Sequence, residues 1–174
     1  KTITEYDGST HKTLIGPSSD GSFVSGDFDT STITSTATLK TRRKKFGESS
    51  VYFDGSAFVS SNDPETSNPK FDFQTDDFTI EGWFRFEDLS STKAMVSRGD
   101  ANTKIELGYS PYLGVNFRAL NSDTEVANVH HFTSTSSTSS YYLPKANSFN
   151  HYAVSRKDND IRMFIDGTLV NTQT

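Results

Sequence analysis

Hydrophobic and polar residues alternate along much of this chain with a period of two. The clearest segment is residues 78–86. One face would carry Phe78, Ile80, Gly82, Phe84 and Phe86, and the other Thr79, Glu81, Trp83 and Arg85. A period of two is typical of a β-strand, because successive side chains point to opposite faces. Since both faces carry large side chains, the segment is predicted to lie in the middle of a sheet that is covered on both sides.

Other segments repeat this pattern between turn signals. Strands are predicted over residues 51–53, 151–156, 161–165 and 168–170, with Asp166-Gly167 as the tight type I′ turn of a hairpin. One short helix is predicted around residues 90–95. Strands that recur every 8–12 residues with turns between them are typical of an all-β sandwich or barrel.

Composition divides the chain into zones. Residues 1–36 are rich in Ser, Thr, Gly and Asp, residues 40–45 carry five Lys and Arg, and residues 133–140 are all Ser or Thr. We therefore expect an N-terminal extension or first strands over residues 1–44 and a main domain over residues 45–174.

Charge and cysteine content exclude several classes of protein. The 174 residues carry a net charge of −5 and contain no cysteine, which excludes disulfides and thiolate metal sites. A nearly balanced charge argues against nucleic acid as a partner. No apolar run approaches the ~18 residues of a membrane span, so no membrane insertion is expected.

Five blocks of sequence carry a family resemblance. They are Phe46-Gly-Glu-Ser-Ser-Val-Tyr-Phe-Asp-Gly55, Thr75-Asp-Asp-Phe-Thr-Ile-Glu-Gly-Trp-Phe84, Met95-Val-Ser-Arg-Gly-Asp100 with Ile105-Glu-Leu-Gly108, Phe149-Asn-His-Tyr-Ala-Val-Ser-Arg156, and Ile161-Arg-Met-Phe-Ile-Asp-Gly167. In this order they resemble the laminin-G-like, concanavalin A-like jelly-roll family. They are most similar to versions in bacteriophage tail-fibre and other virion proteins and in bacterial adhesins. The resemblance covers about residues 45–170, and Phe149 stands where the family usually has Trp.

The resemblance implies an all-β fold, a two-sheet antiparallel sandwich that lacks its last strand or strands. The strand over residues 50–54 would then need a partner from residues 1–36, from another chain or from sequence beyond Thr174. Seven side chains are expected to be largely buried: Phe53, Phe78, Ile80, Phe84, Ala153, Met163 and Ile165.

The function implied is that of a non-enzymatic binding or structural module in a phage or viral surface protein, such as a tail fibre, capsid decoration or appendage. Its partners would be other virion subunits and a host glycan, at the virion surface or in another extracellular setting. One alternative is a bacterial adhesin or filament subunit. Another is a polysaccharide hydrolase, but the related enzymes carry Glu-x-Asp-x-(x)-Glu on one strand, and the nearest match, Asp76-Asp77 with Glu81, has the wrong spacing.

Aromatic residues in strand-end or loop-like contexts are the candidates for glycan contact, since a flat ring can stack on a sugar. They are Tyr109, Tyr112, Tyr141 and Tyr142. Calcium is the one cofactor considered, because it binds loop carboxylates, and the candidate ligands are Asp63, Asp76, Asp158 and Asp160. The basic residues 40–45 are interpreted as a solvated lead-in or an inter-subunit salt-bridge donor, beside Phe46, which the resemblance assigns to the core.

Overall fold

A computed structural model describes residues 3–6, 11–17, 23–25, 33–61, 76–99, 102–131 and 144–174 of the chain. The chain divides into two compact units, Lys1–Asp72 and Phe73–Thr174. The described residues form strands and turns without a helix, so the predicted all-β class is confirmed. Consequently, these residues contain no helix that could span a membrane.

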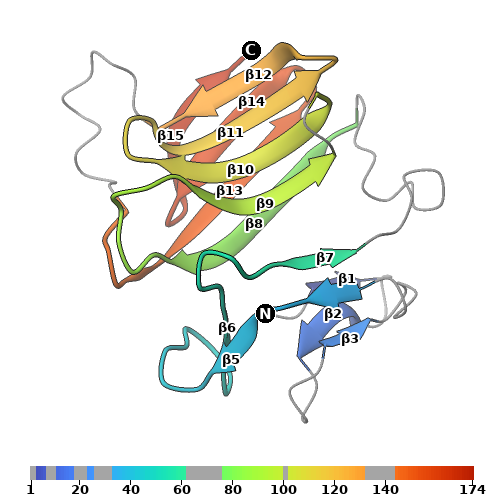
Figure 1. Cartoon of the computed structure of the whole chain (residues 1–174). Helices are drawn as coiled ribbons and strands as arrows, with labels where there is room; N and C mark the ends of the chain where they lie inside the picture. The colour runs from blue at the N-terminus through green and yellow to red at the C-terminus, as the bar shows by residue number, and fades with distance from the viewer. Residues whose placement is uncertain are drawn as a thin grey trace. The chain divides into compact units, whose positions relative to one another are not determined.

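The C-terminal unit is a sandwich of two four-stranded antiparallel sheets (Figure 1). The first sheet has the order β12-β11-β10-β9, and the second has the order β15-β14-β13-β8. The strands of the first are β9 (Lys93–Gly99), β10 (Lys104–Ser110), β11 (Gly114–Asn121) and β12 (Thr124–His130). Those of the second are β8 (Phe78–Arg85), β13 (Phe149–Lys157), β14 (Asp160–Ile165) and β15 (Thr168–Gln173).

The N-terminal unit is built from smaller sheets. β1 (Ile3–Tyr6), β2 (His11–Pro17) and β3 (Phe23–Ser25) form one antiparallel sheet. β4 (Ile33–Ser35) pairs with β7 (Val59–Ser61), and β5 (Thr38–Lys40) pairs with β6 (Ser50–Tyr52). The partner of the strand predicted over residues 50–54 is thus β5, which lies just beyond the predicted segment 1–36. The incomplete C-terminal edge of the sandwich and the domain boundary at residue 45 stay predictions.

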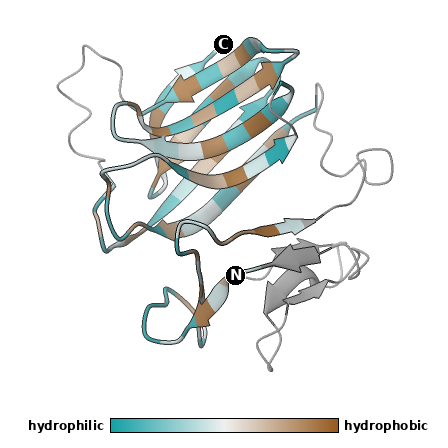
Figure 2. Cartoon of the chain, in the orientation of Figure 1, coloured by the Kyte–Doolittle hydropathy of each residue, from teal (hydrophilic) through white to brown (hydrophobic). Residues whose placement is uncertain are grey.

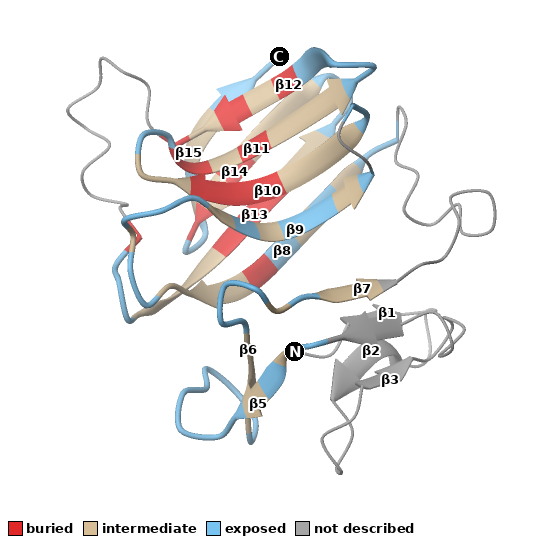
Figure 3. Cartoon of the chain, viewed as in Figure 1, coloured by how far each residue is buried: buried red, intermediate tan, exposed pale blue. Residues whose placement is uncertain are grey.

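Alternating residues of both sheets meet in one hydrophobic core. The first sheet contributes Leu107, Tyr109, Val115, Phe117, Ala127 and Val129, and the second contributes Tyr152, Val154, Met163 and Ile165. Figure 2 shows hydrophobic positions alternating with polar ones along the strands, and Figure 3 shows the buried positions on β10–β14. Burial of this apolar surface is the main favourable term in the stability of the sandwich.

Most of the predicted core positions are confirmed. Met163 and Ile165 are fully buried and Ala153 is buried, while Phe78, Ile80 and Phe84 pack against the core from β8. Phe53 is the exception, because half of its side chain is exposed. It follows β6, which pairs only with β5 among the described residues, and a two-stranded sheet by itself buries little side-chain surface.

Two further sequence predictions are wrong. Residues 90–95 form no helix, because the backbone N–H and hydroxyl of Ser90 donate to Asp88 Oδ1 at 3.0 and 2.6 Å in an Asx turn that leads into β9. Phe46 is not a core residue. It lies in the loop between β5 and β6 with 65% of its side chain exposed.

Two buried tyrosines predict stability changes of opposite sign. Tyr152 is 1% exposed, and its hydroxyl finds no hydrogen-bond partner among the described residues. Tyr109 donates its hydroxyl to the carbonyl oxygen of Leu89 at 3.1 Å. Because a buried unpaired hydroxyl is unfavourable, we expect Tyr152→Phe to raise the free energy of unfolding by about 1 kcal/mol and Tyr109→Phe to lower it by about 1 kcal/mol. Urea unfolding measures both values, and destabilisation by Tyr152→Phe would contradict the first.

Candidate functional site

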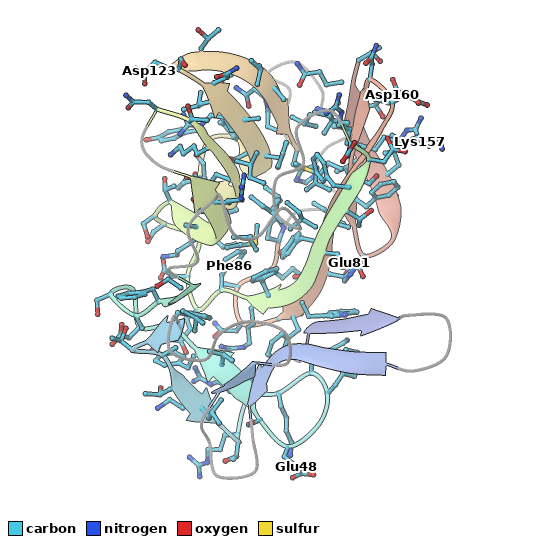
Figure 4. The ribbon with its side chains drawn as sticks, turned by 90° about the vertical axis from the view of Figure 1, so that its right-hand side faces the viewer. Glu48, Glu81, Phe86, Asp123, Lys157 and Asp160 are labelled. Carbon is cyan, nitrogen blue, oxygen red and sulfur yellow. The ribbon has the colours of Figure 1, made fainter. Side chains whose placement is uncertain are left out.

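The outer face of β8 carries polar and aromatic side chains. Since Phe78, Ile80 and Phe84 face the core, Thr79, Glu81 and Trp83 face outward. Figure 4 shows Glu81 on β8, pointing away from the sandwich interior, with Phe86 beyond the end of the strand. Among the described residues β8 pairs with β13 alone, so it ends its sheet instead of lying in the predicted middle position.

Strand register brings β13 residues next to those of β8. His151 is opposite Trp83, Ala153 is opposite Glu81, and Ser155 is opposite Thr79. The rings of Trp83 and His151 are in tilted contact, with centroids 5.3 Å apart and an interplanar angle of 49°. His151 Nε2 also lies 3.5 Å from Glu81 Oε2. The ring contact and the short distance to the carboxylate together favour one orientation of the imidazole on the sheet.

A shallow depression of about 300 Å³ lies over these residues. Ala153 is small, and its neighbour on β14 is Phe164, so the sheet surface is low between Glu81 and Phe164. The lining residues are Thr79, Glu81, His151, Ala153, Ser155, Phe164 and Gly167. They offer two hydroxyls, a carboxylate and an imidazole beside one aromatic ring.

The rim of the depression is fixed by the turn between β14 and β15. Asp166 and Gly167 have φ angles of 48° and 80°, which is the predicted Asp-Gly turn. Asp166 Oδ1 accepts the backbone N–H of His151 at 2.7 Å, and Asp166 Oδ2 accepts the side-chain amide of Asn150 at 2.8 Å. The turn therefore ties Gly167 to the beginning of β13, next to the imidazole.

The arrangement can bind a polar ligand that also has an apolar face. Hydroxyl, carboxylate and imidazole groups can exchange hydrogen bonds with ligand hydroxyls, while the ring of Phe164 can contact C–H groups. Glycoside hydrolysis needs two carboxyl groups on either side of the scissile bond. Among the described residues that line the depression, Glu81 is the one carboxylate.

Two of the four predicted tyrosine candidates, Tyr109 and Tyr112, lie among the described residues, and their surroundings differ. The prediction that Tyr109 contacts a glycan is wrong, because Tyr109 lies in the core and is only 6% exposed. Its ring packs on that of Phe86, with centroids 5.4 Å apart. Burial raises the pKa of its hydroxyl. Tyr112 lies in the turn between β10 and β11 with 88% of its side chain exposed. Tyr141 and Tyr142 lie outside the described residues.

Two of the predicted calcium clusters are adjacent at one end of the second sheet. The backbone N–H of Asp158 donates to Asp77 Oδ1 at 2.8 Å, so this carboxylate already caps the turn between β13 and β14. Asp76 is the exposed neighbour of Asp77, and Asp63 lies outside the described residues.

Asp160 is engaged by other side chains. It accepts hydrogen bonds from Thr174 at 2.8 Å and Arg162 at 2.6 Å, and both lower its pKa. Within the described parts of the chain, no three His, Asp or Glu side chains are grouped so as to hold a metal ion.

The sequence pattern correctly placed Trp83 and Glu81 on one face of a strand, but it did not identify that face as a candidate binding surface. The signal was present, since the single Trp of the chain shares that face with Thr79 and Glu81. His151 and Phe164 were missed because only strand register brings them to this face: His151 lies on β13, next to β8, and Phe164 lies on β14, one strand further. Register over a separation of about 70 residues is not encoded in a periodic pattern.

Comparison with known families agrees with this architecture. The family model of the concanavalin A-like lectin/glucanase superfamily matches residues 53–174. The chain belongs to this superfamily. Comparison with curated proteins and with solved structures gives no match. Both sheets of the sandwich lie within the matched residues of this concanavalin A-like domain, and so does the depression on its outer face.

Proposed function

We propose that this concanavalin A-like domain is a non-enzymatic binding module that takes a carbohydrate in the depression over β8, β13 and β14. The observation that carries the proposal is that one open surface presents both polar groups and an aromatic ring. The polar groups are two hydroxyls, Glu81 and His151, and the ring is that of Phe164. Sugars offer the same combination of hydroxyl groups and an apolar C–H face. Because the surface is shallow, it is better suited to contact with a polysaccharide or with the terminal sugar of a glycan than to enclosure of a small molecule.

The proposal of a module without catalytic activity is supported by the chemistry of glycoside hydrolysis. A retaining hydrolase places its two carboxyl groups ~5–5.5 Å apart and an inverting one ~6.5–9.5 Å apart. Glu81 is 55% exposed in its side chain and pairs with His151, and the described lining supplies no second acid. A carboxylate in this setting is an acceptor for ligand hydroxyls.

We place the domain on the surface of a phage or viral particle, in contact with other virion subunits. Support comes from the ordered sequence blocks, which resemble tail-fibre and virion proteins. The neighbouring coding sequences test this placement: genes for tail or capsid proteins are expected. A setting among secreted bacterial proteins would favour an adhesin or filament subunit instead.

Removal of the ring at the depression should weaken glycan binding. A glycan array selects the ligand, and titration calorimetry then measures its Kd. We expect Phe164→Ala to raise Kd by about 5–30-fold, the equivalent of roughly 1–2 kcal/mol. Glu81→Gln should also raise Kd. This substitution changes a partly exposed side chain and does not remove packing contacts of β14.

Phe53→Ala is the matched control, because it removes a half-exposed aromatic ring that is not a candidate for glycan contact. Its Kd should equal that of the unmodified protein. An array without any bound glycan, or an equal loss in the control, would contradict the site. Release of sugar that Glu81→Gln abolishes would show that the domain is an enzyme.

A further inference from the structure

The loop between β5 and β6 concentrates positive charge on the N-terminal unit. Five of six successive positions are cationic: Lys40, the last residue of β5, and Arg42, Arg43, Lys44 and Lys45 in the loop. All of residues 40–48 are exposed. The loop ends where the hydroxyl of Ser50 donates to the carbonyl oxygen of Arg43, and Figure 4 shows Glu48 on the same loop. This segment precedes the family match, which begins at residue 53.

The charge of the loop is opposite in sign to that of the rest of the chain. Residues 38–52 contain five cations and one anion, a net charge of +4, and the whole chain has −5, so the other residues carry −9. Within the segment, Lys44 Nζ lies 3.8 Å from the carboxylate of Glu48, whose side chain is fully exposed. An exposed pair of this kind contributes little stability. Like charges this close in sequence repel one another, so a bound anion would stabilise the loop.

Aromatic rings accompany the cations. Lys40 Nζ lies 5.1 Å from the ring centroid of Tyr52, and Lys45 Nζ lies 5.8 Å from that of Phe46. The side chain of Phe46 remains 65% exposed. The loop therefore presents ammonium and guanidinium groups together with an accessible apolar ring.

We propose that the loop between β5 and β6 binds an acidic polysaccharide through its sulfate, phosphate or carboxylate groups. Guanidinium groups pair with such anions in a fixed, forked geometry, and ammonium groups add charge. The ring of Phe46 can contact the C–H face of a sugar next to the anion. This site is independent of the depression on the C-terminal unit.

Charge spacing favours a polysaccharide over a nucleic acid or a bilayer. Duplex DNA carries one negative charge per ~1.7 Å of its axis, and an anionic bilayer is an extended charged surface. Either would extend beyond one short loop and be repelled by the −9 carried on the remaining residues. A polysaccharide carries its anions on separate rings of a narrow chain, so it can reach the loop with less repulsion.

The test uses the full chain and compares dextran sulfate with uncharged dextran in a titration at 50 mM and 200 mM salt. We expect binding to dextran sulfate, no binding to dextran, and a Kd that rises with salt. The variant Arg42→Ser/Lys44→Ser should raise Kd at least about tenfold and reduce the log–log salt slope by about 1.5. Polygalacturonate and a phosphorylated mannan then distinguish carboxylate and phosphate from sulfate.

A charge-matched control is Lys145→Ser/Lys157→Ser, which removes two exposed cations from the C-terminal unit. Its Kd should change less than about twofold, and the melting temperature of both variants should stay within about 2 °C of the unmodified value. Binding to uncharged glycans at the depression should be unchanged in Arg42→Ser/Lys44→Ser and weakened in Phe164→Ala, so the two proposed sites are tested separately.

Three results would overturn the proposal. The first is an absence of binding to every acidic polysaccharide, and the second is an equal loss in both double variants. The third is tighter binding, at equal anion concentration, to a 20-base-pair duplex or to vesicles rich in phosphatidylserine. Light scattering at both salt concentrations adds a further outcome. If the loop variant abolishes a salt-sensitive oligomer and dextran sulfate is not bound, the loop recognises a second copy of this chain.

Discussion

Phe117→Ala is expected to lower the free energy of unfolding by about 3–5 kcal/mol, the range for truncation of a buried phenylalanine. Phe117 lies on β11 with 1% of its side chain exposed. Its ring meets that of Phe78, on the other sheet, with centroids 5.7 Å apart. The substitution would therefore leave a cavity between the sheets and remove a contact that joins them.

Urea unfolding, followed by the fluorescence of the single Trp, measures this change. Trp83 reports on the sandwich from the outer face of β8, away from the substituted position. Tyr112→Ala should change the free energy of unfolding by less than about 0.5 kcal/mol, as expected for an exposed position. Similar losses in the two variants would mean that Phe117 is not in a close-packed interior.

The faces of individual strands could be predicted because local periodicity fixes them. Ile80 and Phe84 face the core as the alternation of β8 requires, and Asp166-Gly167 forms the turn expected from its residue types. Both features depend on residues close together in the chain. The two-sheet sandwich itself was implied by the family resemblance and is confirmed.

Residues whose environment depends on distant partners were predicted less well. Gly108, Ser110 and Pro111 made the surroundings of Tyr109 look like a loop, yet β10 continues through Tyr109, which faces Val115 on β11. Phe53 and Phe46 lie next to a two-stranded sheet, and how far such a sheet is covered depends on tertiary packing. The depression required the register of three strands at once, and no single stretch of sequence specifies that.

The turn that closes the rim of the depression should be sensitive to Asp166. Its carboxylate accepts two hydrogen bonds, from the backbone of His151 and the side chain of Asn150, and its φ angle of 48° lies in the left-handed region. Asp166→Ala removes both bonds and leaves the β-carbon in that region without the polar side chain that offsets its strain. We expect the free energy of unfolding to fall by about 2–3 kcal/mol, roughly 1 kcal/mol for each bond and for the backbone conformation.

Two matched substitutions separate these contributions. Asp166→Gly relieves the backbone conformation but loses the bonds, so about 2 kcal/mol of destabilisation is expected. Asp166→Asn tolerates the left-handed conformation and keeps a side-chain acceptor, so it should cost about 1 kcal/mol or less. Urea unfolding is expected to show destabilisation that increases from Asp166→Asn to Asp166→Gly to Asp166→Ala. Because the lost bonds also position the backbone of His151, glycan binding at the depression should weaken in Asp166→Gly, even where that variant is fully folded. Unchanged affinity in Asp166→Gly would show that the imidazole is held by Trp83 and Glu81 without help from the turn.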